Sequence, residues 1–87
     1  MTTEQELRTL VMSVLTEVAP DIDAAAIDPD ADFLEELDID SMDFLNIIVA
    51  INERTGIEIP ERDYPKLSTV NDAVSYLAHA DRQATGA

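Results

Sequence analysis

The chain of 87 residues contains no cysteine and no tryptophan, and only two glycines and five basic residues. Without cysteine it can form neither a disulfide nor a thiolate metal site, so its stability must come from apolar packing. Because Gly56 and Gly86 stand far apart, the chain has no glycine-rich loop of the kind that cradles phosphates. These absences exclude several common classes of binding site.

Positive charge is also scarce. The 19 acidic residues outnumber the five basic ones, and the formal net charge is −14. Nucleic acids and anionic membranes are bound through clusters of lysine and arginine, so we expect neither as a partner. Basic patches on other proteins are the natural complement of such a chain. Hydrophobic residues make up 46% of the sequence, which argues for a folded domain rather than disorder.

No long hydrophobic run is present. The longest covers residues 47–51, far short of the roughly 20 residues that span a bilayer. The N-terminus has neither the basic flank nor the apolar core of a signal peptide. We therefore expect a cytoplasmic monomer without stable membrane insertion. Its length predicts a single domain over residues 1–87, with a core at about 4–80 and a frayed tail at 81–87.

Helical periodicity is the main pattern that the sequence does contain. Over residues 4–18 apolar side chains recur at steps of three and four, which predicts an amphipathic helix. Thr3 and Glu6 form a capping-box pattern at its start. Pro20 ends it, because the residue before a proline avoids helical backbone angles.

A second helix is predicted over residues 41–55, and Gly56 suits the left-handed position that follows a helix. This helix is apolar over more than one face, which indicates burial on several sides or a surface that binds something else. Pro60 opens a short helix, which Pro65 limits to one or two turns.

The last helix is capped by Ser68 or Thr69 and fades after Ala80. No segment alternates apolar and polar residues as a half-buried strand does. The predicted fold class is therefore all-α: a four-helix bundle of three longer helices and one short helix, with a long loop between helices one and two.

That loop, residues 20–40, is unusually long for a small domain, and such loops are more often functional than not. Asp23 can cap a short helical turn within it. Phe33 and Leu37 are expected to fold back into the core.

A serine at the start of the second helix is the main candidate site. Asp40 is a good N-cap, Ser41 then takes the first helical position, and Asp43 lies in the first turn, where negative charge suits the helix dipole. A hydroxyl there is exposed, and the unpaired N–H groups beside it favour an anion such as a phosphodiester attached to it. Taken alone, an Asp-Ser pair is more often an ordinary helix start.

Aspartates at alternate positions suggest a calcium loop at first sight. Asp28, Asp30 and Asp32 have the spacing with which an EF-hand loop begins. However, Phe33 stands where that loop needs glycine, and Ile39 stands where it needs glutamate. We therefore predict no dedicated metal site.

No catalytic residue is predicted either, and we expect a protein that is not an enzyme. Ser41 lacks the glycine-flanked turn of a hydrolase nucleophile. The only histidine, His79, lies near the end of the last helix, where solvation at the surface is the simpler role.

The segment of residues 40–43, Asp-Ser-Met-Asp, resembles the attachment motif of acyl carrier proteins. Its neighbours match the family pattern at matching spacing: Phe33 and Leu37 precede it, and residues 57–60 and 67–70 follow the second helix. The resemblance covers nearly the whole chain, at least residues 4–80.

The resemblance implies a carrier with a prosthetic group. Ser41 would hold 4′-phosphopantetheine, transferred from coenzyme A by a phosphopantetheinyl transferase, and acyl groups would be carried on it as thioesters. The further partners would be acyl ligases or synthases and acyltransferases with basic patches, in fatty acid, lipid or polyketide biosynthesis.

By family position, the residues that would contact these partners are Asp40, Met42, Asp43, Val49 and Glu53. The chain departs from the family in having Asp38 in place of a glycine, an exchange that aspartate tolerates at a left-handed angle. Asn46 and Asn52 replace acids, and Arg54 adds a positive charge. These departures suggest a specialised carrier, loaded by a dedicated ligase or serving one pathway.

The resemblance also implies a pocket for the acyl chain between the second and third helices, near Phe44, Ile48, Ile59 and Leu67. For Phe44 and Ile48, membership of the plain core is the simpler role.

Two alternatives stay open at this point. The first is a carrier of amino acids, such as a D-alanyl or peptidyl carrier, which shares the serine motif. The second is an acidic helical adaptor that binds basic partners without a prosthetic group.

Overall fold

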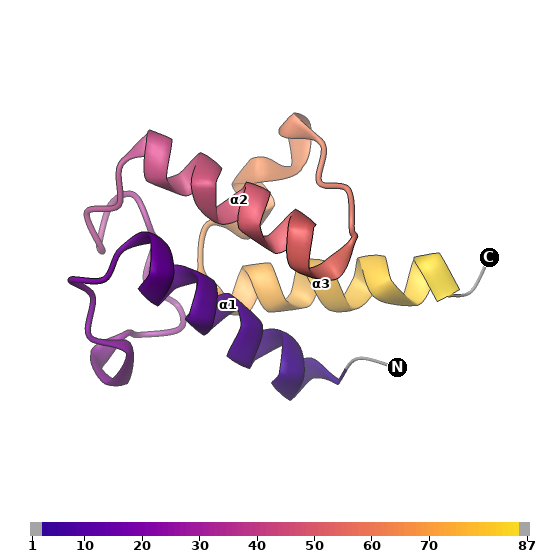
Figure 1. The fold of residues 1–87 in the computed structure, drawn as a ribbon, viewed down its shortest axis with the longest axis horizontal. Helices are drawn as coiled ribbons and strands as arrows, with labels where there is room; N and C mark the ends of the chain where they lie inside the picture. Colours follow the sequence, from indigo (N-terminus) through magenta and orange to yellow (C-terminus); the bar gives the residue numbers. More distant parts are fainter. Residues whose placement is uncertain (1–2, 86–87) are drawn as a thin grey trace.

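Three α-helices and two short 3₁₀-helices make up the part of the chain that the computed structural model describes, residues 3–85 (Figure 1). In chain order they are α1 (Glu4–Val18), η1 (Ala24–Ala26), α2 (Ser41–Thr55), η2 (Glu61–Leu67) and α3 (Val70–Thr85). Helix α1 packs against both α2 and α3, and η2 packs against α3. The predicted all-α fold is confirmed, and so is the long connection between α1 and α2. Within residues 3–85 no helix is both long and apolar enough to cross a bilayer.

Helix α1 begins and ends where the sequence predicts. The hydroxyl of Thr3 accepts a hydrogen bond from the N–H of Glu6 at 3.1 Å, which satisfies one of the free donors of the first turn. After Val18 the chain leaves the helix at Ala19. The apolar stripe of α1 is buried in the core, at Leu7, Val11, Val14 and Leu15.

Both ends of α2 are also set by local interactions. A carboxylate oxygen of Asp40 accepts a hydrogen bond from the N–H of Asp43 at 2.8 Å, so Asp40 is the N-cap. At the other end Gly56 adopts a left-handed φ of 71° and donates its N–H to the carbonyl of Asn52. This is the position at which glycine avoids the steric cost of other residues.

The two apolar faces of α2 have different environments. One face lies in the core and consists of Phe44, Ile47, Ile48 and Ile51. The other face, Met42, Leu45 and Val49, is exposed to solvent. Of the two explanations that the sequence allows, the structure supports a helix with an apolar surface left for something else.

The long loop is tied to the bundle by its aromatic side chain. Phe33 is almost fully buried, its ring lies 6.4 Å from that of Phe44, and its N–H donates to the carbonyl of Ser68 at 2.8 Å. Leu37 packs against the core but is only half-buried. The prediction for Phe33 is confirmed, whereas Leu37 reaches the core only in part.

The alternating aspartates stabilise the loop itself. Asp28 accepts a hydrogen bond from the backbone of Asp30 at 2.9 Å, and Asp32 accepts two from the N–H groups that follow it. The carboxylate of Asp30 accepts from the amide of Asn71 at 2.6 Å, and Asn71 in turn accepts from the guanidinium of Arg8 at 2.8 Å. One asparagine of α3 thereby joins the loop to α1.

The 3₁₀-helix η2 differs slightly from its prediction. It follows Pro60 as expected, but Pro65 lies inside it and the helix continues to Leu67. A proline inside a helix removes a single N–H donor, and η2 tolerates this loss because it is short and already irregular. Leu67 is buried and packs the end of η2 against the core, as predicted.

Helix α3 starts at the predicted cap but ends later than predicted. The hydroxyl of Thr69 accepts from the N–H of Asp72 at 3.0 Å. The helix runs on to Thr85, beyond the predicted end at Ala80, because no proline or glycine occurs before Gly86. The predicted fraying of residues 81–87 stays a prediction, and its last two residues lie outside the described range.

The charge of the chain predicts a salt-dependent stability. The ion pairs Arg54–Glu17 and Lys66–Asp63 offset little of the net charge of −14, so repulsion between carboxylates opposes folding. We expect the thermal midpoint Tm to rise when sodium chloride or magnesium chloride is added to a low-salt buffer, because screening weakens this repulsion. Calorimetry or circular dichroism would measure the shift. A midpoint that does not respond to salt would contradict the expectation.

Candidate functional site

The hydroxyl of Ser41 lies where a helix begins. Ser41 is the first residue of α2, directly after the N-cap Asp40, and its side chain is exposed. Asp40 uses its carboxylate for the N–H of Asp43. The other N–H groups of a first helical turn have no acceptor within their helix and favour a negative group placed next to them. A phosphodiester on the Ser41 oxygen therefore fits the position.

The loop before Ser41 is fixed to the core close to the serine. Asp38 has a φ of 55°, the only positive value among non-glycine residues from 3 to 85. Aspartate tolerates this left-handed angle better than most residues do, as the sequence predicts for the position. Next to it, Ile39 is buried and donates its N–H to the carbonyl of Phe33 at 3.0 Å. Ile39 is thereby fixed in the core two residues before Ser41, and the serine is left outside.

The residues that the resemblance implies for partner docking lie on one end and one side of α2. Asp40 is exposed just before the helix. On α2 itself Met42, Val49 and Glu53 are exposed, and Asp43 is half-buried. The exposed fractions of Met42 and Val49 are 71% and 52%, which is high for apolar side chains.

Two exposed leucines are not among the residues that the sequence predicts for docking. Leu45 and Leu34 have exposed fractions of 44% and 45%. The position of Leu45 follows from its spacing, three residues after Met42 and four before Val49, which places all three on one helical face. No local signal distinguishes Leu34 from its buried neighbour Phe33.

The positive charge on α2 does not weaken this surface as the sequence suggested. Arg54 forms an ion pair with Glu17 of α1, and its guanidinium also lies 3.4 Å from the hydroxyl of Ser13. Arg54 is therefore directed towards α1. Asn52, one of the two residues that replace acids, donates its side-chain amide to the carbonyl of Ile57 at 2.7 Å and fastens the chain that leaves α2.

Of the four residues implied for an acyl pocket, two line a groove. The groove has a volume of about 440 Å³ and lies between α2 and η2, where Ile48 and Ile59 take part in its lining. Phe44 and Leu67 do not line it, and both are buried in the core. The other lining residues are Val49, Asn52, Glu58, Pro60 and Tyr64.

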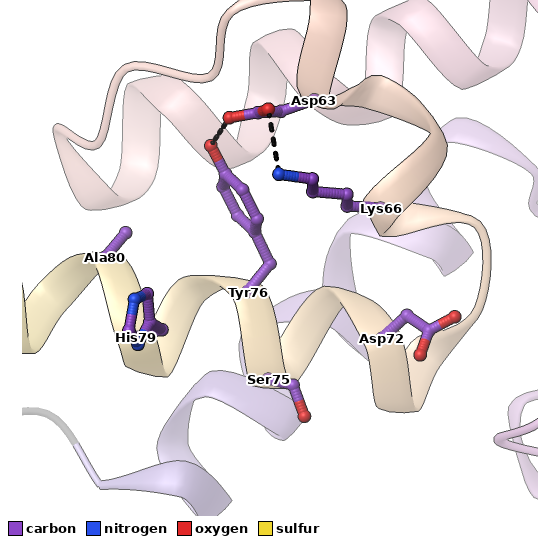
Figure 2. A pocket seen from close by; sticks show the side chains of 7 residues that line it. All are labelled: Asp63, Lys66, Asp72, Ser75, Tyr76, His79 and Ala80. Carbon is purple, nitrogen blue, oxygen red and sulfur yellow. Dashed lines mark hydrogen bonds and ion pairs between the residues drawn. The ribbon is translucent and has the colours of Figure 1, made fainter.

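A larger groove of about 650 Å³ lies between η2 and α3 and has a different character (Figure 2). Its walls carry charged and polar side chains. The hydroxyl of Tyr76 donates to Asp63 at 2.7 Å, and the ammonium of Lys66 lies 3.3 Å from the same carboxylate. His79 lies on its α3 side, whereas α2 begins at the opposite end of the molecule, so the fold does not pair Ser41 with the histidine (Figure 1).

The bond between Tyr76 and Asp63 perturbs both groups. Accepting this hydrogen bond holds the pKa of Asp63 below its usual value. Burial, together with the bond to the carboxylate, raises the pKa of Tyr76 to about 12. Among the side chains that the structure describes, no three carboxylate or histidine groups gather where they could hold a metal ion.

These shifts predict a loss of stability at alkaline pH. The pKa of Tyr76 is raised from 10.0 to about 12, so the folded state keeps a proton that the unfolded state loses, and stability falls as the pH rises between these values. The stability advantage of the wild type over Tyr76→Phe should shrink over this range in urea denaturation. Tyr64→Phe controls for the loss of a phenol. A constant difference between wild type and Tyr76→Phe would refute the role of the bond.

Comparison with known proteins agrees with the site geometry. The family model described as "Phosphopantetheine attachment site" matches residues 5–77. An acyl carrier protein of Acidothermus cellulolyticus is 35% identical over 77 residues, which is 88% of this chain and 90% of the relative. The chain belongs to the acyl carrier protein family. Another relative in this family, from Helicobacter hepaticus, is 32% identical over 88% of this chain and 95% of its own length, and one from Renibacterium salmoninarum is 42% identical over 75% of each.

Family membership decides between the predictions that the sequence left open. The prosthetic group of an acyl carrier protein is 4′-phosphopantetheine, and the role of such a protein is to carry rather than to catalyse. The relatives are acyl carrier proteins. This finding favours an acyl carrier over an aminoacyl carrier and over an adaptor without a prosthetic group. A carrier of this kind acts by meeting synthases and transferases.

Proposed function

We propose that the Ser41 oxygen is the attachment point of 4′-phosphopantetheine and that the chain delivers acyl groups from this arm to partner enzymes. When attached, the group supplies a thiol on which an acyl group is held as a thioester. The observation that carries the proposal is the exposed hydroxyl at the first position of α2, inside the segment that the family model matches.

The residues around Ser41 hold the attachment point steady. Asp40 caps α2, and Ile39 anchors the preceding turn in the core, so the serine keeps a fixed place while its side chain stays free. The first-turn N–H groups and the positive end of the helix dipole stabilise the negative phosphodiester. Nearby carboxylates repel it, but a covalent bond keeps the group in place against this repulsion.

The chain itself performs no bond making or breaking in this proposal. The only histidine of the sequence, His79, lines the groove between η2 and α3, and the modification of Ser41 is the work of a phosphopantetheinyl transferase. Acyl ligases or synthases and acyltransferases then load and unload the thiol. The exposed side of α2 is where these enzymes dock, and Met42, Asp43, Val49 and Glu53 contact them.

We further propose that the groove between α2 and η2, lined in part by Ile48 and Ile59, shelters the part of the acyl group nearest the thioester. Phe44 and Leu67 are buried in the core and do not line this groove. The departures on α2, Asn46 in particular, support a specialised carrier that serves one pathway.

Incubation with coenzyme A and a broad-range phosphopantetheinyl transferase tests the attachment. Mass spectrometry of the whole chain should show one added phosphopantetheine, and peptide mapping should place it on Ser41. Loading assays with fatty-acyl and aminoacyl ligases should then attach an acyl group to the thiol. An adduct that accepts amino acids and refuses acyl groups would contradict the proposed cargo, and the absence of any adduct would contradict the proposal as a whole.

A further inference from the structure

The groove between α2 and η2 lies on the side of α2 that carries Ser41. Two of its lining residues, Ile48 and Asn52, follow Ser41 after two and three turns of the helix, so all three lie in one line along α2. The helical rise places Ile48 about 10 Å from Ser41 along this line. An arm that leaves the Ser41 oxygen along α2 therefore leads to the groove. The occupant that the fold offers to this groove is the acyl group on the chain's own arm.

The groove is shallow. Ile48 is buried and forms its floor, whereas Val49, Glu58 and Pro60 are exposed along its sides. The carboxylate of Glu58 keeps water at the rim, because a charged group is costly to remove from water. An acyl chain in such a groove buries one side and leaves the other side in water. Each further methylene therefore gains only part of the stabilisation of full burial.

The ring of Tyr64 stands between this groove and the core. Tyr64 lines the groove from η2, and its ring centroid lies 6.3 Å from that of Phe44, with the ring planes at 80°. This is the edge-to-face arrangement that aromatic rings prefer. The ring of Phe44 in turn lies 6.4 Å from that of Phe33. Three rings thus form a row from η2 to the long loop, and Tyr64 is its outer member.

Phe44 is the place where the groove and the core come closest. Its exposed fraction is 8%, compared with 1% for Ile47 on the same buried face of α2. An acyl chain that passes from the groove towards Phe44 has to displace the Tyr64 ring. If this ring were absent, the side of Phe44 that it covers would become part of the groove. Tyr64 therefore determines whether the groove ends at the surface or continues inwards.

Helix η2 holds Tyr64 in this position from the other side. The neighbouring residue Asp63 accepts the hydrogen bond from Tyr76 of α3 at 2.7 Å (Figure 2). Leu67 is buried at the end of η2. Two adjacent residues of η2 thus contact two different helices, since Asp63 contacts α3 and Tyr64 contacts α2. A movement of η2 away from α3 breaks the bond to Tyr76, so the bond keeps η2 and the groove wall in place.

We propose that Tyr64 limits the acyl group that is sheltered between α2 and η2 to a short straight chain. The inference rests on the proposed function. The ring against Phe44 closes the groove towards the core, so a short acyl group fills the groove and the far end of a longer one stays in water. The limit concerns shelter and not attachment, because the thioester is formed on the arm. Tyr64 is thereby a residue that determines cargo specificity.

Carriers loaded with acyl groups of different length test this limit. A broad-range phosphopantetheinyl transferase attaches butyryl-, octanoyl- or dodecanoyl-phosphopantetheine from the corresponding acyl-coenzyme A. The thermal midpoint Tm of each form is compared with that of the form with a free thiol, because a group bound by the folded state raises Tm. In the wild type the acyl forms should melt above the thiol form. The octanoyl and dodecanoyl forms should melt within about 1 °C of each other, since the added carbons stay in water.

Removing the ring should lift the limit. In Tyr64→Ala the dodecanoyl form should melt at least about 4 °C above the octanoyl form, because burial of about one further methylene is enough for such a shift. Tyr64→Leu keeps an apolar contact with Phe44 and should show a smaller gain in the same direction. It also provides the test if Tyr64→Ala does not fold. All midpoints are compared within one variant, so a loss of stability common to its forms cancels.

Two control variants separate the ring from other changes of the groove. Tyr64→Phe keeps the ring and removes only the hydroxyl. Val49→Ala shortens another side chain that lines the groove, but one that is exposed at its side. In both controls the octanoyl and dodecanoyl forms should melt together, as in the wild type.

Several results would overturn the limit and leave the proposed function intact. One is a wild-type midpoint that keeps rising from octanoyl to dodecanoyl, and another is a midpoint that does not respond to any acyl group. An unchanged plateau in both Tyr64→Ala and Tyr64→Leu would also overturn it, and so would an equal gain in Val49→Ala. A wild-type chain that accepts no phosphopantetheine would overturn the proposed function itself, and the limit with it.

Discussion

Replacing Ser41 with alanine should abolish phosphopantetheine attachment completely. The oxygen of Ser41 is the only atom of this residue that can accept the phosphopantetheinyl group, so its removal leaves no route to the adduct. The fold should not suffer, because Ser41 is exposed at the first position of α2 and alanine is a better helix former than serine. Whole-protein mass spectrometry after exhaustive treatment with the transferase measures the effect.

The matched control for this experiment is another exposed serine. Ser75 lies on α3, away from the start of α2, and Ser75→Ala should accept one phosphopantetheine as the wild type does. Thermal midpoints of both variants should stay close to that of the wild type. An adduct that persists in Ser41→Ala would place the attachment site elsewhere and would refute the proposed function.

Replacing Phe33 with alanine should cause the largest loss of stability. Phe33 is 1% exposed, packs against Phe44 and joins the loop to the bundle through the carbonyl of Ser68. Truncating a buried phenylalanine costs roughly 3–5 kcal/mol through lost burial and the cavity that remains. Small domains are stable by only about 5–15 kcal/mol, so the variant should unfold at much lower urea concentrations.

The neighbouring residue provides the control for this prediction. Leu34→Ala changes an exposed side chain in the same turn and should shift the free energy of unfolding by less than about 0.5 kcal/mol. If both variants lose the same stability, the loop is not anchored through the Phe33 ring. If neither does, the loop is dispensable for folding.

The anchoring of the loop connects stability with function. Phe33 and Ile39 hold the two ends of the turn that leads to Ser41, and both are buried. The same turn exposes Leu34, Glu35 and Glu36. A variant that releases Phe33 from the core should therefore disturb the proposed attachment site at Ser41 as well.

The position of Arg54 changes how the departures from the family pattern are interpreted. On the sequence alone its positive charge reduces the acidity of α2. In the fold Arg54 pairs with Glu17 of α1, so it adds no repulsion towards a basic partner. The departures that remain are Asn46 and Asn52, which leave Asp43 and Glu53 as the acidic residues of α2.

The amino-acid sequence by itself determined the helices and the place of the proposed attachment site. Caps at Thr3 and Asp40, the glycine after α2 and the prolines act over a few residues, so their effects can be predicted without knowing the fold. The same holds for Ser41, whose exposure follows from being first in a capped helix. The end of α3 is harder to predict: the sequence places it at Ala80, but the helix continues to Thr85. No strong stop signal follows Ala80, so helical propensity carries the helix on.

Only the tertiary structure decided which of the apolar and charged side chains remain available to other molecules. Periodicity marks Met42 and Phe44 alike as apolar, but Phe44 is buried by distant residues and Met42 is not. Phe33 and Leu34 differ for the same reason. Likewise, Arg54 is taken up by a residue 37 positions earlier, a contact that depends on how α1 and α2 pack rather than on any local pattern.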